Sequence, residues 1–316
     1  MAGPIDRACE LAASWARRPS RGVSASLRIF YGQKALSLPL LVRAELCVAL
    51  GEAAELEGRF EYARYLYASA VSAADPVRDE RLYARAAVRS LLNASRIGDR
   101  SVLTQVARVV EGMPGRRVTA RLACLGAVAR GLEKLLEGKL QPARRAFEAA
   151  MGAAWESRDS DAEAVSQHLL GHVWSRLGRM ALAREHAEAA ERAAAKSGSW
   201  LLDRRFALEA LMFRLMARPT ADALAGARRI VDEVRRLGFP RLESLAWARL
   251  ARGLLCDGAR AEAFLDRSEE LLPEGHPDRA FVQSLRAAAS RRRGMRGEGD
   301  GGVDRELALL VKLARS

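Results

Sequence analysis

The stretch LLEGKLQPARRAFEAAM, residues 135–151, decides the fold. Gly138 is expected to end one helix, because glycine tolerates the left-handed conformation that a helix stop needs. Pro142 stands where the next helix would begin, and proline is tolerated in a first helical turn. Ala143 and Phe147 then recur at helical spacing and line one face. The stretch therefore predicts two antiparallel helices joined by a tight turn.

The same stretch is one copy of a repeat with a period of 40 residues. The turn glycine recurs at Gly58, Gly98, Gly138, Gly178 and Gly258. The missing member falls at Arg218, beside the helix breaker Pro219. Five residues after these positions stand mostly small residues, among them Ala63, Ala143, Ala183 and Ala263. Seven residues before them, a further glycine stands at Gly51, Gly131 and Gly171. A degenerate seventh copy is expected to open the chain.

One helix pair has too little apolar surface to be stable alone, so the pairs must stack to bury a continuous core. No alternating strand pattern stands between the helices. The sequence therefore predicts an all-α solenoid of about seven antiparallel helix pairs over residues 1–292. A flexible linker rich in glycine and arginine follows over residues 293–302. The chain is then expected to end in a short amphipathic helix over residues 303–316.

Composition narrows the function classes. Hydrophobic residues make up 49% and charged residues 29%, which is ordinary for a globular protein. The net charge of +13 suggests a nucleic-acid partner, but only five of the 52 basic residues are lysines. Such an excess of arginine is typical of a GC-rich genome. Binding of nucleic acid through the arginine-rich surface therefore stays an alternative.

Targeting and redox signals are absent from the sequence. The four cysteines stand far apart and form no CxxC pair, which favours a reducing cytoplasm. The first residues contain an acid and lack an unbroken apolar core, so no signal peptide is expected. No charge-free apolar run approaches about 20 residues, so no transmembrane helix is expected.

The repeat resembles the tetratricopeptide repeat (TPR). The turn glycine, the small residue in the middle of the preceding helix and the small–aromatic–small spacing carry the resemblance. It is best in Gly51, Gly58, Ala63, Tyr67 and Ala70, and again in Gly131, Gly138, Ala143, Phe147 and Ala150. The period of 40 exceeds the usual 34 and is similar to the longer repeats of bacterial transcriptional regulators. HEAT and armadillo repeats share this length but match the glycine pattern less well.

The resemblance implies a right-handed superhelix with a concave groove lined by the first helix of each pair. Such grooves hold a peptide or a helix of a partner protein. The resemblance implies no catalytic residue.

Two clusters are candidate partner-binding residues of that groove. Glu45, Glu52 and Glu55 are spaced by seven and three, so they share one side of a helix. His168, His172 and Arg176 are expected to form a second stripe. Arg252 is a further candidate. Solvated helix faces are the alternative interpretation of both clusters.

Neither a metal site nor a nucleotide site is expected. His168 and His172 share a helix face, but a zinc protease would need glutamate where Leu169 stands. The segment GLEKLLEGKL, residues 131–140, lacks the glycine spacing and the terminal Ser or Thr of a phosphate loop. No cofactor, metal or catalytic residue is therefore assigned.

The sequence predicts a non-enzymatic cytoplasmic bacterial adaptor that binds a partner protein or peptide. The first alternative is a ligand- or peptide-sensing regulatory subunit of a bacterial transcription or signalling system. The terminal helix is expected to cap the solenoid. Self-association through that helix is the other outcome left open.

Overall fold

The structure is a computed structural model that describes residues 3–255, 258–276, 278–291 and 301–315. Within these residues every regular element is a helix and no β-strand occurs. The chain divides into two compact units, residues 1–203 and residues 204–316. The boundary falls inside one helix, and each unit is described by itself. Most of the predicted linker, residues 293–300, lies outside the described residues, as does Cys256.

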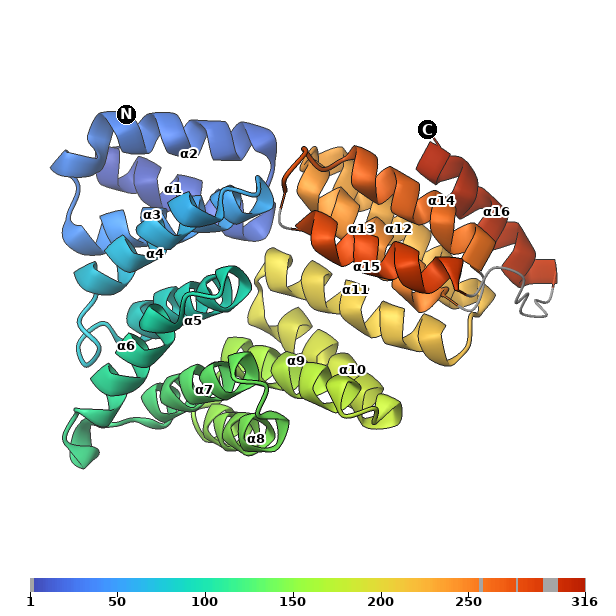
Figure 1. Ribbon diagram of the computed structural model, residues 1–316. Helices are drawn as coiled ribbons and strands as arrows, with labels where there is room; N and C mark the ends of the chain where they lie inside the picture. Colours follow the sequence, from blue (N-terminus) through green and yellow to red (C-terminus); the bar gives the residue numbers. More distant parts are fainter. Residues whose placement is uncertain (1–2, 256–257, 277, 292–300, 316) are drawn as a thin grey trace. The chain divides into compact units, whose positions relative to one another are not determined.

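Unit 1 is a stack of antiparallel helix pairs (Figure 1). Its helices are α1 (Pro4–Arg17), α2 (Arg21–Lys34), α3 (Leu40–Leu56), α4 (Phe60–Ala73), α5 (Glu80–Ile97), α6 (Arg100–Glu111), α7 (Ala120–Leu136), α8 (Leu140–Glu156), α9 (Ser160–Arg176) and α10 (Met180–Ser197). Two 3-10 helices join pairs, η1 (Ala35–Ser37) and η2 (Gly115–Arg117). The first helix of each pair also packs on the first helix of the next, which builds one continuous layer. The prediction of an all-α solenoid is confirmed.

Unit 2 begins within α11 (Trp200–Ala217). Its other helices are α12 (Ala221–Leu237), α13 (Pro240–Gly253), α14 (Gly258–Glu270), α15 (Asp278–Ser290) and α16 (Gly301–Arg315). Helix α16 packs on α12 and α14 and buries Leu307, Leu310 and Ala314 in the core of unit 2. The apolar stripe of this terminal helix is therefore covered by its own unit.

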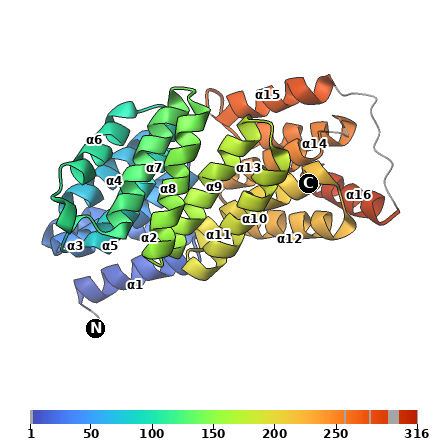
Figure 2. The ribbon, with the colours of Figure 1, turned by 90° about the horizontal axis from the view of Figure 1, so that it is seen from below.

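The turn from α7 to α8 shows how one pair forms. Gly138 has a φ of 75°, the left-handed conformation, and its N–H donates to the carbonyl of Leu135 at 3.1 Å. The N–H of Lys139 donates to the carbonyl of Lys134 at 2.9 Å, which completes a Schellman motif. Figure 2 shows α7, α8, α9 and α10 as neighbours in the resulting stack.

Glycine inside the first helix lets the two helices of a pair approach. A Cβ at Gly131 would lie 2.2 Å from Cε1 of Phe147, and one at Gly51 would lie 2.4 Å from Cε1 of Tyr67. Both aromatic rings are fully buried. At Gly171 no aromatic side chain faces the glycine, and the nearest atom is the carbonyl oxygen of Ala183 at 3.3 Å. The aromatic ring therefore takes the space that the missing side chain leaves.

The 40-residue phase holds in unit 1 and slips in unit 2. Helices α4, α6, α8 and α10 each begin two residues after their turn glycine. Helix α14 instead begins at Gly258 itself, so this glycine is not the turn residue. As a result Ala261 and Phe264 are fully buried, whereas Ala263 is only half-buried. The interior position predicted for Ala263 is therefore taken by its neighbours, because the helix starts early.

The degenerate copy expected at the N-terminus corresponds to α1 and α2, where Leu27 is fully buried. Among the described residues, no helix is long and apolar enough to cross a lipid bilayer.

Candidate functional site

A groove of about 750 Å³ opens on unit 1 along the first helices of successive pairs. Helices α1, α3, α5, α7 and α9 contribute, together with the turn that leads into α11. Small side chains leave the space, among them those of Ala13, Ala16, Ala49 and Ala84. Further apolar lining comes from Val48, Val88, Leu125, Val165 and Leu202. The groove thus combines an apolar floor with charged side chains.

Three ion pairs join α3 to α5, and we call this set the paired wall. The three pairs are Glu45–Arg85, Glu52–Arg89 and Glu55–Arg96. The pairs of Glu45 and Glu52 line the groove, and that of Glu55 does not. The Oε1 atom of Glu52 lies 2.8 Å from Nε of Arg89. The Oε2 atom of Glu55 lies 3.0 Å from Nη1 of Arg96. Of the acidic cluster predicted from the sequence, Glu45 and Glu52 line the groove and Glu55 does not. Each of the three carboxylates is neutralised by an arginine of the same chain.

Glu52 lies at the centre of the paired wall. Its side chain is only 11% exposed, and its Oε2 atom accepts a hydrogen bond from Nε1 of Trp15 at 3.0 Å. Burial raises the pKa of Glu52 above its ordinary value, although Arg89 and Trp15 both act to lower it. A buried charge of this kind is stable only while its partners remain in place.

Arg89 connects the paired wall to another part of the groove. Burial alone would lower the pKa of Arg89, but the Glu52 carboxylate and neighbouring anionic groups leave this pKa raised. Its Nη2 atom also donates to Oγ of Ser199 at 3.5 Å, in the turn between α10 and α11. The guanidinium therefore remains charged and holds two sides of the groove together.

A fourth ion pair lies at the N-terminus of α9. Asp159 caps this helix by accepting from the N–H of Ala162 at 3.1 Å. Its other oxygen, Oδ2, lies 2.6 Å from Nε of Arg121 on α7. Asp159 and Arg121 are therefore both engaged inside the protein.

Three cations of the groove have no ion-pair partner within the described part of the chain; we call Arg81, Arg158 and Lys196 the open rim. All three are exposed. Close to them in sequence, Asp161 on α9 also lines the groove, and its Oδ1 atom is buried without a hydrogen-bond partner in the described structure. The groove therefore offers three exposed positive charges that have no ion-pair partner in the described structure.

Arg158 has an unusual backbone. Its φ of 51° is left-handed, and among the described residues all others with positive φ are glycines. It closes the Schellman motif of α8, where its N–H donates to the carbonyl of Trp155 and the N–H of Asp159 donates to that of Ala154, both at 3.1 Å. A non-glycine residue is strained in this conformation.

The second predicted cluster lies elsewhere on unit 1. His168 is buried on α9, and its ring meets that of His172 edge to face with the centroids 4.5 Å apart. Arg176 is exposed at the end of the same helix. None of the three lines the groove. Arg252 belongs to unit 2, where burial lowers its pKa, Glu209 opposes that change and Arg249 adds to it.

The open rim was not found from the sequence, although a signal for Arg158 existed. Gly198 and Gly238 form a second series with a step of 40, at the turns that lead from one pair to the next. Arg158 stands one step before Gly198. An arginine where the series calls for glycine was the available clue.

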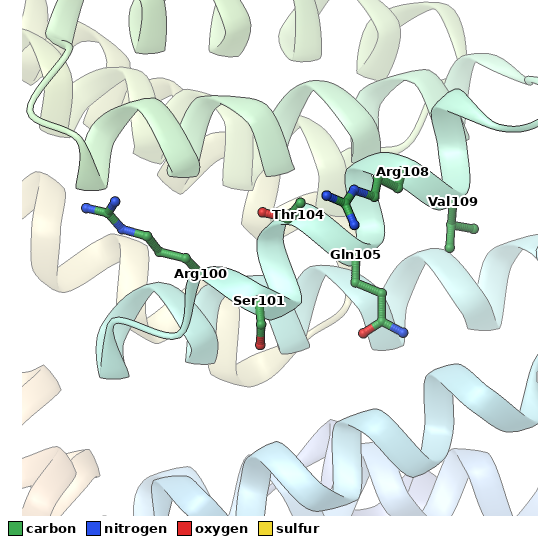
Figure 3. A pocket seen from close by; sticks show the side chains of 6 residues that line it. All are labelled: Arg100, Ser101, Thr104, Gln105, Arg108 and Val109. Atoms are coloured by element: carbon green, nitrogen blue, oxygen red, sulfur yellow. The ribbon is translucent and has the colours of Figure 1, made fainter.

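A second hollow, of about 590 Å³, lies along α6 (Figure 3). Its six lining residues all come from this helix: Arg100, Ser101, Thr104, Gln105, Arg108 and Val109. Two of them are already engaged, since Arg100 donates to the carbonyl of Leu136 at 3.2 Å and Thr104 bonds to Glu133 at 3.3 Å. Only the groove draws on several helices, so it is the stronger candidate.

Two of the solved structures that resemble this chain cover more than nine-tenths of its length. One is a signal transduction ATPase with numerous domains (STAND) protein with a tetratricopeptide repeat sensor, from Pyrococcus horikoshii. It is 13% identical, with 92% of this chain and 47% of that chain covered and a TM-score of 0.45. The other is BtubC from P. vanneervenii, 15% identical, with 93% and 95% covered and a TM-score of 0.37. This chain spans about half the length of the STAND protein. No family model and no curated protein matches the sequence.

Proposed function

We propose that the protein is a non-enzymatic adaptor that binds a polypeptide segment of a partner protein in the groove of unit 1. The observation that carries this proposal is the groove itself, built by the first helices of successive pairs. Its volume of about 750 Å³ is in the range of known ligand sites, which span roughly 300–1,000 Å³. An apolar floor with a few fixed charges suits a short segment anchored by one or two side chains.

We also infer that the repeats are of the tetratricopeptide type. The contacts of Gly51 with Tyr67 and of Gly131 with Phe147 support this inference, because they pair a small residue of the first helix with an aromatic ring of the second. Among the described cysteines, Cys9, Cys47 and Cys124 form no disulfide, which supports a location in the reducing cytoplasm.

The test is to fill the groove without disturbing the core. Ala13 and Ala16 are exposed residues of α1 that line it, so the double variant Ala13→Trp, Ala16→Trp should block it and still fold. Ala149→Trp, an exposed alanine on α8 outside the groove, is the matched control. A random-peptide library displayed on phage is panned on the wild-type chain. We expect selected peptides to bind wild type and Ala149→Trp but not the double variant. Equal binding to all three proteins would refute the groove as the site.

A ligand-sensing regulatory subunit is the second candidate. The groove volume favours it, because a small molecule fits the same space as a peptide anchor. Two results together would favour this alternative. The selection would yield no peptide that depends on the groove, and small molecules would raise the melting temperature of wild type but not of the blocked variant.

A further inference from the structure

The charges that line the groove do not balance. Six basic and four acidic side chains contribute, which leaves an excess of two positive charges: Arg81, Arg85, Arg89, Arg121, Arg158 and Lys196 against Glu45, Glu52, Asp159 and Asp161. Three of the basic residues are neutralised by ion pairs inside the groove. The excess therefore resides on the open rim, where the side chains are exposed and free to meet a ligand.

Arg158 shows that one of these cations is kept at a cost to the fold. The corresponding turns after α10 and α12 hold Gly198 and Gly238, with φ values of 76° and 73°. Glycine adopts this conformation without steric cost, whereas arginine does not. Strained residues of this kind persist mainly where they serve a function. Because its side chain lines the groove, the function that the strain suggests is contact with a ligand.

We propose that the groove of unit 1 selects an acidic polypeptide segment, whose carboxylates pair with Arg81, Arg158 and Lys196. The proposal rests on the proposed function and adds the chemistry of the partner. An apolar side chain of the segment occupies the floor beside Val88 and Leu125.

A nucleic acid fits the same groove less well. The floor is made of alanine, valine and leucine rather than of exposed aromatic rings on which bases could stack. A peptide can supply both acidic groups for the open rim and an apolar side chain for the floor.

The first arm of the test determines the composition of bound peptides. The library selection on full-length wild-type protein should enrich Asp and Glu among peptides whose binding the Ala13→Trp, Ala16→Trp variant abolishes. A selected peptide, labelled with fluorescein, then serves as the probe in polarisation assays. Its affinity should fall as salt is raised, because exposed charge pairs are screened.

The second arm changes the rim charges one at a time. Arg158→Glu and Lys196→Glu should each weaken probe binding by roughly tenfold or more, whereas Arg158→Lys should stay within about threefold. Arg145→Glu makes the same change of charge on the exposed side of α8, outside the groove, and should leave affinity within about twofold. Melting curves of all variants establish that they fold.

The outcomes separate this inference from the proposed function. Groove-dependent peptides that are not acidic, or that bind Arg158→Glu as well as wild type, would overturn the inference and leave the adaptor intact. Peptides that bind the Ala13→Trp, Ala16→Trp variant as tightly as wild type would overturn both this inference and the proposed function. A single-stranded DNA oligonucleotide that displaces the probe and binds more tightly than any selected peptide would overturn the acidic polypeptide in favour of nucleic acid.

Discussion

The open rim and two of the three pairs of the paired wall line the same groove, yet the charges of rim and wall are arranged in opposite ways. On the wall, every carboxylate of α3 has an arginine of α5 within ion-pair distance. On the rim, Arg81, Arg158 and Lys196 have no such partner in the described structure. Charges buried in pairs hold helices in register, whereas exposed unpaired charges contribute little to folding. The wall should therefore govern stability and the rim should govern binding.

The largest effect is expected at the centre of the wall. Replacing Arg89 with Met would leave the buried carboxylate of Glu52 without its cation, and loss of one partner of a buried pair costs about 3–5 kcal/mol. Urea unfolding followed by circular dichroism measures this loss. The matched double variant Glu52→Gln, Arg89→Met removes both charges and keeps an acceptor for Trp15. It should recover most of the stability; a double variant as unstable as the single one would contradict the role of the buried charge.

The Arg89→Met variant should also respond to pH. Burial already raises the pKa of Glu52, and loss of Arg89 removes the largest influence that lowers it. In the unfolded chain the pKa of glutamate is about 4.3. The folded variant therefore binds a proton more readily than its unfolded form, so its stability rises as pH falls through the folded pKa. The deficit relative to wild type should be smaller at about pH 5 than at about pH 7.

Tyr67 lies close to the paired wall, but its hydroxyl, unlike the charged groups of the wall, is unpaired in the described structure. Its hydroxyl is fully buried without a hydrogen-bond partner in the described structure, and a buried unpaired polar group costs about 1–3 kcal/mol. Tyr67→Phe should therefore stabilise unit 1 by about 1–2 kcal/mol in the same urea assay. Tyr31→Phe is the control, because the Tyr31 hydroxyl accepts from Sγ of Cys47 at 3.3 Å. That variant should lose stability; a loss in both variants would indicate a missing partner for Tyr67.

Arg158 belongs to the open rim, and its strained backbone also affects stability. Arg158→Gly relieves the left-handed strain and should stabilise the protein by about 1 kcal/mol, while it removes a rim charge and weakens binding. The reverse exchange, Gly198→Arg, should cost about the same amount. No atom lies within 4 Å of a Cβ built at Gly198, so only backbone strain is added there. Thermal unfolding measures the change in stability of each variant. Melting temperatures equal to that of wild type would show that the turn stores no strain.

Much of the fold could be predicted because its signals are local. The turn conformation of Gly138 and the contact of Gly131 with Phe147 both follow from residues within one repeat. The phase failed at Ala263 because α14 begins at Gly258, two residues earlier than the repeat predicts. A shift of the helix start by two residues rotates the buried face.

The candidate site was predicted only in part, because pairing across helices is not a local property. Arg85 stands 40 residues after its partner Glu45, as the repeat would give, but Arg89 stands 37 residues after its partner Glu52. The offset follows from the rotation and register of α5 against α3, which no repeat pattern encodes. An exposed arginine such as Arg81 looks the same in sequence whether a carboxylate stands beside it or not.

The smallest effect on stability is expected at Lys196. This side chain is exposed and makes no ion pair with any residue that the structure describes. Lys196→Met should therefore change the free energy of unfolding by less than about 0.5 kcal/mol at about 0.15 M salt. At low salt the variant should become slightly more stable, because it removes repulsion among the cations of the groove. Chemical denaturation at two salt concentrations measures both effects. A loss above about 1 kcal/mol would mean that Lys196 contributes to the stability of the fold. The open rim would then stabilise the protein, as the paired wall does, and would not be a set of charges available to a ligand.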